Sequence, residues 1–264
     1  MLRLYAGAAR MSILDQLQYR TANYLYMIGM IAEPVIYLVV WSTVAESQGG
    51  SVGGYSAGAL AAYYIVWTLV RNMNIVLTPY AWEWRIKDGQ LSSELLKPVH
   101  PIHRDLGGFA GWKIVTILYW LPIAAILVWL FPPAFSTDTF SVLAFVVALW
   151  GGFLVRFMLL WALGLVTFWT TRVGAIFDVF FTVELLASGR LVPLSLMPPW
   201  AQTAADWLPF QWAFQFPIET LIGRLSRAEI LRGLGMQAFW TLVGVGILVV
   251  VWPRAVKRYS AVGG

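Results

Sequence analysis

The chain has 264 residues, of which 59% are hydrophobic and only 12% are charged. Soluble domains are about 45–50% apolar and about 25% charged, so this composition excludes an ordinary soluble protein and predicts one that is solvated by lipid. Cysteine is absent from the sequence, which excludes disulfides and thiolate metal sites. The net charge of +5 is modest, and its cationic residues gather near the ends of apolar segments. That pattern favours membrane topology over nucleic-acid binding.

Residues 1–22 are predicted to form an amphipathic helix that lies in the membrane interface. Tyr5, Ala9 and Ile13 recur at steps of four on one face, and most charged residues fall elsewhere. The alternative is a plain leader that continues into the first span. The arginines of this segment are not followed by a long apolar core, so we expect no cleavable signal peptide.

Six membrane-spanning helices are expected next, because each crossing takes about 20 apolar residues. We place them at residues 24–44, 57–78, 109–131, 140–169, 173–186 and 234–251. A polar segment at residues 80–108 separates the second span from the third. The fold class is thus an all-α integral membrane protein, with one transmembrane domain over residues 1–264.

Orientation follows from lysine and arginine, which concentrate on the side of the polar segment and of both termini. This bias predicts that both termini are cytoplasmic, with Lys113 and Arg172 counted on that side. Arg190 and three further arginines fall on the outer side and run against the rule; the three are Arg224, Arg227 and Arg232. The predicted location is the cell (inner, cytoplasmic) membrane, crossed several times.

Residues 189–230 do not form a clean span. Prolines and a glycine interrupt an apolar and aromatic stretch, which is too broken for one straight helix and too apolar for a solvated loop. We predict short helices that dip into the outer leaflet before the last span. The residues that mark this segment are Gly189, Pro193, Pro198, Trp207, Pro209, Trp212 and Pro217.

Sequence motifs for chemistry are missing. There is no G-x-x-x-x-G-K-[ST] phosphate loop, no G-x-S-x-G and no H-E-x-x-H. His100 and His103 are close enough to share a metal, but a site needs three or four ligands, so a solvated loop is the favoured interpretation. We therefore expect no catalytic, cofactor-binding or metal-binding residue in this chain.

Four ionisable residues lie inside predicted spans, where charges are functional candidates. Glu33 and Arg71 are at similar depth, roughly 13 Å from the cytoplasmic edge at 1.5 Å per residue. Arg156 and Glu184 match at roughly 15–20 Å. We predict that each set forms an ion pair, with static helix packing favoured over a transport role. Asn74, like Asn72, can add hydrogen bonds between helices.

The polar segment contains a short predicted helix with an apolar face. Gly89 suits a helix end, Pro98 terminates the helix on its far side, and Leu91, Leu95 and Leu96 share one face. Such a helix can insert into a groove on a partner protein. It can equally rest on lipid headgroups, with tryptophan as an interface anchor.

Three stretches now resemble the ABC transporter type-2 permease family, in particular the group of ABC-2 family transporter proteins. They read LQYRTANYL at residues 17–25, IKDGQLSSELLKP at 86–98, and GRLVPLSLMP at 189–198, the last followed by LPF at 208–210 and FP at 216–217. The resemblance covers nearly the whole chain. None of these stretches is a catalytic signature.

The resemblance implies a membrane subunit of an ATP-driven exporter. Such a subunit pairs with a second permease, identical or related, and with two copies of a cytoplasmic ATP-binding subunit that holds ATP and Mg. Residues 1–22 resemble the connecting helix, residues 80–108 the coupling segment, and residues 189–230 the re-entrant helices that close the outer end. The residues implied in coupling are Trp84, Arg85, Ile86, Gly89, Leu91, Leu95 and Pro98.

Three other interpretations stay open. A proton- or ion-coupled secondary carrier would use Glu33 or Glu184 as its titrating group. A membrane-embedded enzyme would need a nucleophile, base or metal cluster at one depth, and the sequence offers none. A scaffold without transport is excluded by no feature of the sequence, and the substrate is not specified by the residues.

Overall fold

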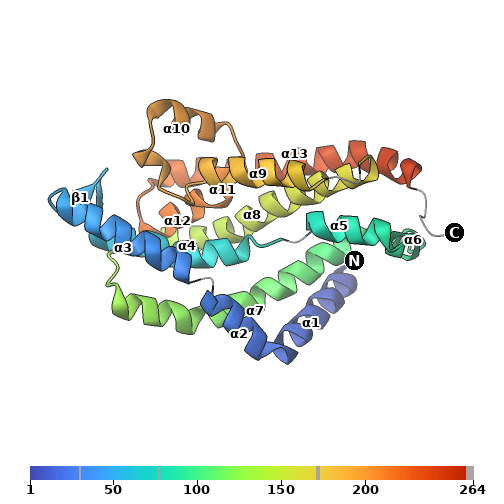
Figure 1. Cartoon of the computed structure of the whole chain (residues 1–264), viewed down its shortest axis with the longest axis horizontal. Helices are drawn as coiled ribbons and strands as arrows, with labels where there is room; N and C mark the ends of the chain where they lie inside the picture. The colour runs from blue at the N-terminus through green and yellow to red at the C-terminus, as the bar shows by residue number, and fades with distance from the viewer. Residues whose placement is uncertain (30, 77, 171–172, 260–264) are drawn as a thin grey trace.

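The computed structural model describes residues 1–29, 31–76, 78–170 and 173–259, and it is almost entirely helical over them (Figure 1). The described residues include one short hairpin, in which Ser51–Val52 (β1) pairs antiparallel with Tyr55–Ser56 (β2). Four helical segments of the described chain are long and apolar enough to cross a membrane. They are Arg20–Ser47, Pro101–Leu130, Thr139–Phe168 and Arg227–Arg258.

The bundle has two distinct ends. The start of the N-terminal helix and the end of the C-terminal helix lie toward one end in Figure 1, and the β1 hairpin lies at the other. Hydrogen bonds agree with this placement, since the Tyr5 hydroxyl lies 2.6 Å from His103 Nδ1, and the Ser92 and Tyr259 hydroxyls are 2.9 Å apart.

The N-terminal helix α1 (Leu2–Gln18) packs along the first turns of α7 (Pro101–Leu130). The contact is close because α7 offers glycine there: a Cβ on Gly111 would come 2.4 Å from the Ala9 carbonyl oxygen. Tyr5, Ala9 and Ile13 are half-buried, as the predicted face requires, whereas Leu2 and Leu17 are exposed. Helix α1 ends four residues before the predicted boundary at 22.

The first predicted span is two helices, α2 (Arg20–Gly29) and α3 (Ala32–Ser47). The prediction of a continuous helix was wrong here, and the residues explain the break. Pro34 has no N–H to donate to the preceding turn, and Gly29 costs helix stability. Both helices belong to the candidate span Arg20–Ser47.

Helix α4 (Ala57–Met73) is the centre of the bundle. Every residue from Leu60 to Val70 is buried, which is why this stretch is apolar on all sides. The helix starts where the Ser56 hydroxyl accepts a hydrogen bond from the Ala59 N–H. With 17 residues it is shorter than the predicted second span.

Two short helices follow, α5 (Thr78–Lys87) and α6 (Gln90–Leu95). They precede α7, which begins at Pro101 rather than at the predicted residue 109. Proline suits the first helical position, and the His100 side chain caps the helix by accepting from the Ile102 N–H. Residues 101–108 thus belong to a spanning helix rather than to a free polar segment.

Two further long helices complete the bundle, α8 (Thr139–Gly164) and α13 (Arg227–Arg258). Helix α13 starts earlier than predicted because Ser226 and Glu229 form a capping box. It also runs through Pro253, so the predicted stop at residue 252 was wrong. A 3-10 turn, Leu165–Phe168, extends α8.

The segment before α13 is broken, as its prolines predict. Helix α9 (Gly174–Ala187) has 14 residues, and its start lies next to Arg172, which is outside the described residues. Short pieces follow: a 3-10 turn at Leu194–Leu196, α10 (Pro199–Asp206), α11 (Phe210–Ala213) and α12 (Gln215–Ile222). Helix α10 stands at the edge of the bundle in Figure 1.

Candidate functional site

Helices α5 and α6 (the α5–α6 unit) pack against three long helices, α7, α8 and α13. The anchor of α5 is Trp82, which is fully buried. Its ring meets Trp161 of α8 edge-on at 4.8 Å and Trp252 of α13 at 5.9 Å. Room for the indole exists because position 164 is glycine: a Cβ there would lie 2.0 Å from Trp82 Cδ1.

A charge network ties the same unit to α7. Arg85 donates two hydrogen bonds to the Asp105 carboxylate, at 2.7 and 2.6 Å, in a bidentate fork. Asp105 also accepts from Trp161 Nε1 at 3.0 Å. Glu94 of α6 pairs with Arg104 of α7. Burial alone would lower the pKa of Arg85. The Asp105 and Glu94 carboxylates outweigh this effect, so the pKa of Arg85 is raised.

The residues predicted for coupling do not all face outward. Trp84 is exposed and Leu96 is 88% exposed, whereas Leu91 is completely buried in the chain's own core. Leu95 and Ile86 are half-buried beside it, and Pro98 is exposed. Gly89 starts α6 with a φ of 67°, a left-handed conformation that favours glycine. Of the predicted partner-facing leucines 91, 95 and 96, only Leu96 is fully exposed.

The two histidines are not in a solvated loop, and that expectation was wrong. The His100 ring lies 4.4 Å from the Trp252 ring, and His103 bonds to Tyr5. Burial, with the nearby charge of His103, lowers the pKa of His100. The described residues contain no group of three or more side chains suited to hold a metal.

Both predicted ion pairs form inside the bundle. Arg71 Nη1 lies 2.6 Å from Glu33 Oε2. Arg156 donates to both oxygens of Glu184, at 2.7 and 2.9 Å. Arg190 was assigned to the outer surface, but its Nη1 lies 3.5 Å from Glu184 Oε2. Arg190 is thus half-buried against Glu184 rather than free at a surface.

A second cation was also misplaced by sequence reasoning. Lys113, counted as a cytoplasmic charge, is fully buried. Its Nζ donates to the carbonyls of Asn72 and Ile75, at 3.0 and 2.6 Å. Arg156 donates to a carbonyl between these two, that of Asn74. The carboxyl end of α4 thus lies inside the protein, where cations replace the missing helical donors.

The break after α9 lies against α4. The Tyr63 hydroxyl donates to the Gly189 carbonyl at 2.8 Å, and Gly189 has a φ of 76°. A Cβ there would come 2.3 Å from Gln215 Oε1, the oxygen that accepts from the Leu194 N–H. Tyr63 is six residues into α4, which is about 9 Å along its axis. The chain therefore turns within the bundle and not beyond its end.

The other residues of the broken segment divide between surface and core. Trp207 is 78% exposed and Trp212 is 7% exposed. Prolines 193, 198 and 209 each directly precede a short helix, and Pro217 is buried within α12.

Gln237 of α13 is a structural residue that sequence reasoning missed. It donates to the carbonyls of Ala148 and Trp212, both at 2.8 Å. Asn74 makes a predicted interhelical bond, to the Ala213 carbonyl at 2.8 Å. Asn72, predicted to do the same, donates within its own helix.

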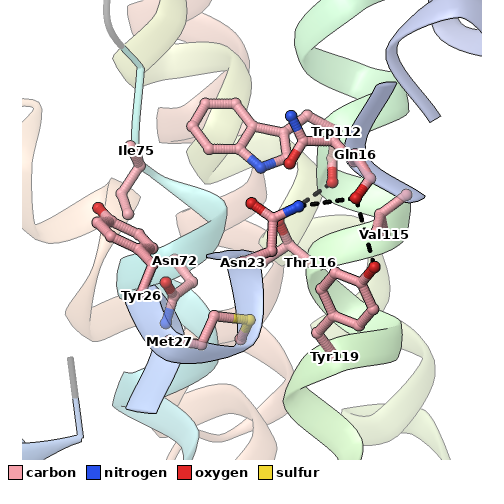
Figure 2. A pocket seen from close by; sticks show the side chains of 10 residues that line it. All are labelled: Gln16, Asn23, Tyr26, Met27, Asn72, Ile75, Trp112, Val115, Thr116 and Tyr119. Atoms are coloured by element: carbon pink, nitrogen blue, oxygen red, sulfur yellow. Dashed lines mark hydrogen bonds between the residues drawn. The ribbon is translucent and has the colours of Figure 1, made fainter. Parts of the chain in front are cut away.

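A small polar cavity lies where α1 and α2 meet α4 and α7 (Figure 2). Asn23 Nδ2 donates to the Gln16 carbonyl at 2.8 Å, and Figure 2 shows Asn72 and Thr116 on the facing helices. Its volume is about 20 Å³, which suits about one water molecule. It is too small to hold a transported molecule.

The comparison with known proteins identifies the chain. A family model described as ABC-2 family transporter protein matches residues 31–263. No curated protein matches the sequence. The match covers the chain from α3 to α13, including the α5–α6 unit, and it implies association with ATP-binding subunits. The chain therefore belongs to the ABC-2 transporter family and is a multi-pass membrane permease subunit of an ABC transporter.

Proposed function

We propose that the chain is one of two permease subunits of an exporter in the cell membrane. Two cytoplasmic ATP-binding subunits hold ATP and Mg and supply the energy, and this chain binds neither. The second permease is an identical or a related chain, and the pathway runs between the two. Both termini and the α5–α6 unit face the cytoplasm.

The observation that carries this proposal is the fastening of α5–α6 to the bundle. Asp105 links the unit to α7, Trp161 and the glycine at 164 to α8, and Trp252 and Tyr259 to α13. A displacement of α6 by an ATPase would move these helices together as a body. The exposed side chains Trp84 and Leu96 are the contact surface for that partner.

Six membrane crossings are the second part of the proposal. Four long helical segments supply four of them, and α4 and α9 supply the other two. The turn at Gly189 against Tyr63 supports a re-entrant hairpin that closes the outer end of the pathway. The start of α1 and the end of α13 lie toward one end of the bundle (Figure 1), which fits an even number of crossings.

The secondary-carrier alternative is less well supported. It needs Glu33 or Glu184 to bind and release a proton. Each carboxylate is paired with arginine, and Glu184 has two arginines within 3.5 Å. These ion pairs account for both carboxylates as contacts that fix helix packing, without a transport role.

The test is copurification with the ATP-binding subunit, followed by ATP-dependent transport. Leu96→Glu and Trp84→Glu change exposed side chains, so the fold should persist while ATPase capture falls at least about tenfold, or about 1.4 kcal/mol. Phe135→Glu, on the exposed α7–α8 loop at the opposite end, is the matched control. Capture and transport at wild-type level in both variants would remove the coupling assignment. Transport driven by a pH gradient without ATP would favour the carrier.

A further inference from the structure

Five charged side chains form one connected group inside the bundle. Glu184 of α9 lies between Arg156 of α8, at 2.7 Å, and Arg190, at 3.5 Å. Glu33 of α3 and Arg71 of α4 make the adjacent pair at 2.6 Å, and Arg190 interacts electrostatically with both. Residues from four helices and the turn after α9 thus converge on one region.

The charges in this group do not balance. Three arginines face two glutamates, which leaves one positive charge in excess. Lys113, buried beside Arg156, adds another cation whose partners are main-chain carbonyls. Static packing would need matched charge, since an unpaired ion within a membrane protein is costly.

The excess charge is on Arg190. Arg156 uses both Glu184 oxygens and the Asn74 carbonyl, so Glu184 is already taken. Arg190 makes no hydrogen bond to Glu184 at 3.5 Å, and its Nε is buried without a partner among the described residues. A guanidinium with free donors in a dry site is a receptor for an oxyanion.

The group is open on one side. Side-chain exposure is 1% at Glu184, 16% at Arg190, 20% at Arg71 and 34% at Glu33. The group is therefore reached from the side of Glu33 and Arg71, and Glu184 is its most enclosed member. The buried Trp67 and Phe214 rings flank the group, at 5.1 Å from the Arg71 guanidinium and 5.4 Å from that of Arg190.

We propose that Arg190 and Arg71 bind the anionic head group, a phosphate or a carboxylate, of the amphiphile that this permease transports. This inference rests on the proposed permease function. Arg190 donates to the oxyanion, and Arg71 supplies the second positive charge. The site lies at the turn after Gly189, inside the bundle and next to the proposed outer gate.

Binding is tested on the purified chain in an uncharged maltoside detergent, by tryptophan fluorescence during titration with decyl phosphate. We expect saturable binding that weakens at least tenfold in Arg190→Gln and Arg71→Gln and is partly kept in Arg190→Lys. Arg227→Gln removes an exposed arginine that is 3.6 Å from Asp138 and should bind like wild type. Decyltrimethylammonium should not compete. Unchanged affinity in Arg190→Gln, with an unchanged unfolding temperature, would overturn the proposal.

A second arm separates a transported molecule from a resident bilayer lipid. The complex with its ATP-binding subunit is placed in phosphatidylcholine vesicles, with or without phosphatidylglycerol. A transported anion predicts that decyl phosphate stimulates ATP hydrolysis by the wild-type complex, that Arg190→Gln loses this stimulation, and that the control Arg227→Gln keeps it. Stimulation by phosphatidylglycerol with no further response to decyl phosphate would assign the site to a lipid and refute transport. Failure to capture any ATPase would instead refute the proposed function, whatever the binding result.

Discussion

Glu184→Gln is expected to be among the most destabilising single changes in the bundle. The side chain is 1% exposed and accepts hydrogen bonds at 2.7 and 2.9 Å from Arg156, with Arg190 at 3.5 Å. Removing the carboxylate charge leaves the buried Arg156 guanidinium without its counter-ion. Breaking a buried ion pair from one side costs about 3–5 kcal/mol. The amide keeps the shape of the side chain, so the loss reports charge rather than packing.

The matched control is Glu33→Gln, which breaks the Arg71 pair. That carboxylate is 34% exposed, so solvent screens it and the expected cost is only about 0.2–1 kcal/mol. The assay is reversible unfolding in mixed micelles, followed by tryptophan fluorescence. The double change Arg156→Met with Glu184→Leu should cost less than Glu184→Gln alone, because fewer charges are stranded. A loss in Glu184→Gln no larger than that in Glu33→Gln would refute the reasoning.

Three further predictions concern the packing of the bundle. Gly164→Ala should destabilise the chain by about 1–3 kcal/mol, because the new methyl collides with Trp82. The control is Gly108→Ala, whose methyl meets open space and should not destabilise the chain. Equal losses of stability in thermal unfolding would contradict this prediction. The pKa of His100 is lower in the folded protein than in the unfolded chain, where it is about 6.5. The neutral, packed ring therefore stabilises the fold above about pH 6.5, and this contribution is lost as the pH falls below that value. The unfolding temperature should therefore drop between about pH 7 and pH 5, and drop less in His100→Gln; parallel pH curves would exclude His100. Gln237→Leu removes two buried hydrogen bonds and should cost about 1–3 kcal/mol by the same unfolding assay, whereas a neutral effect would mean that water replaces the amide.

Much of the architecture could be predicted because the thickness of the bilayer fixes the length of a spanning helix and the depth of each residue within it. Depth matching was enough to pair Glu33 with Arg71 and Arg156 with Glu184, since lone charges at that depth are costly. The prolines of residues 189–230 predicted the break before α13. The rule on positive charge predicted both termini on one side, and the start of α1 and the end of α13 lie toward one end of the bundle (Figure 1).

The errors share one physical cause, which is that sequence patterns do not say what a residue contacts. Lys113 was counted as a surface charge because lysine near a span end normally is one; the open carbonyls of α4 that bind it are distant in sequence. Leu91 belongs to an apolar face, but periodicity cannot distinguish a face buried in the chain from one offered to a partner. The segment at residues 24–44 was predicted as one span, because a proline inside an apolar stretch permits a kinked helix as well as a broken one.

The glycine at position 164 limits how these proteins can be recombined. Trp82 fills a notch that exists only because that glycine lacks a side chain, and Arg85 needs Asp105 to hold its charge. A chimera that exchanges residues 78–98 alone between two permeases would place the indole and guanidinium against unmatched surfaces. Swapping partner preference should therefore require transplanting positions 105, 161 and 164 together with the α5–α6 unit.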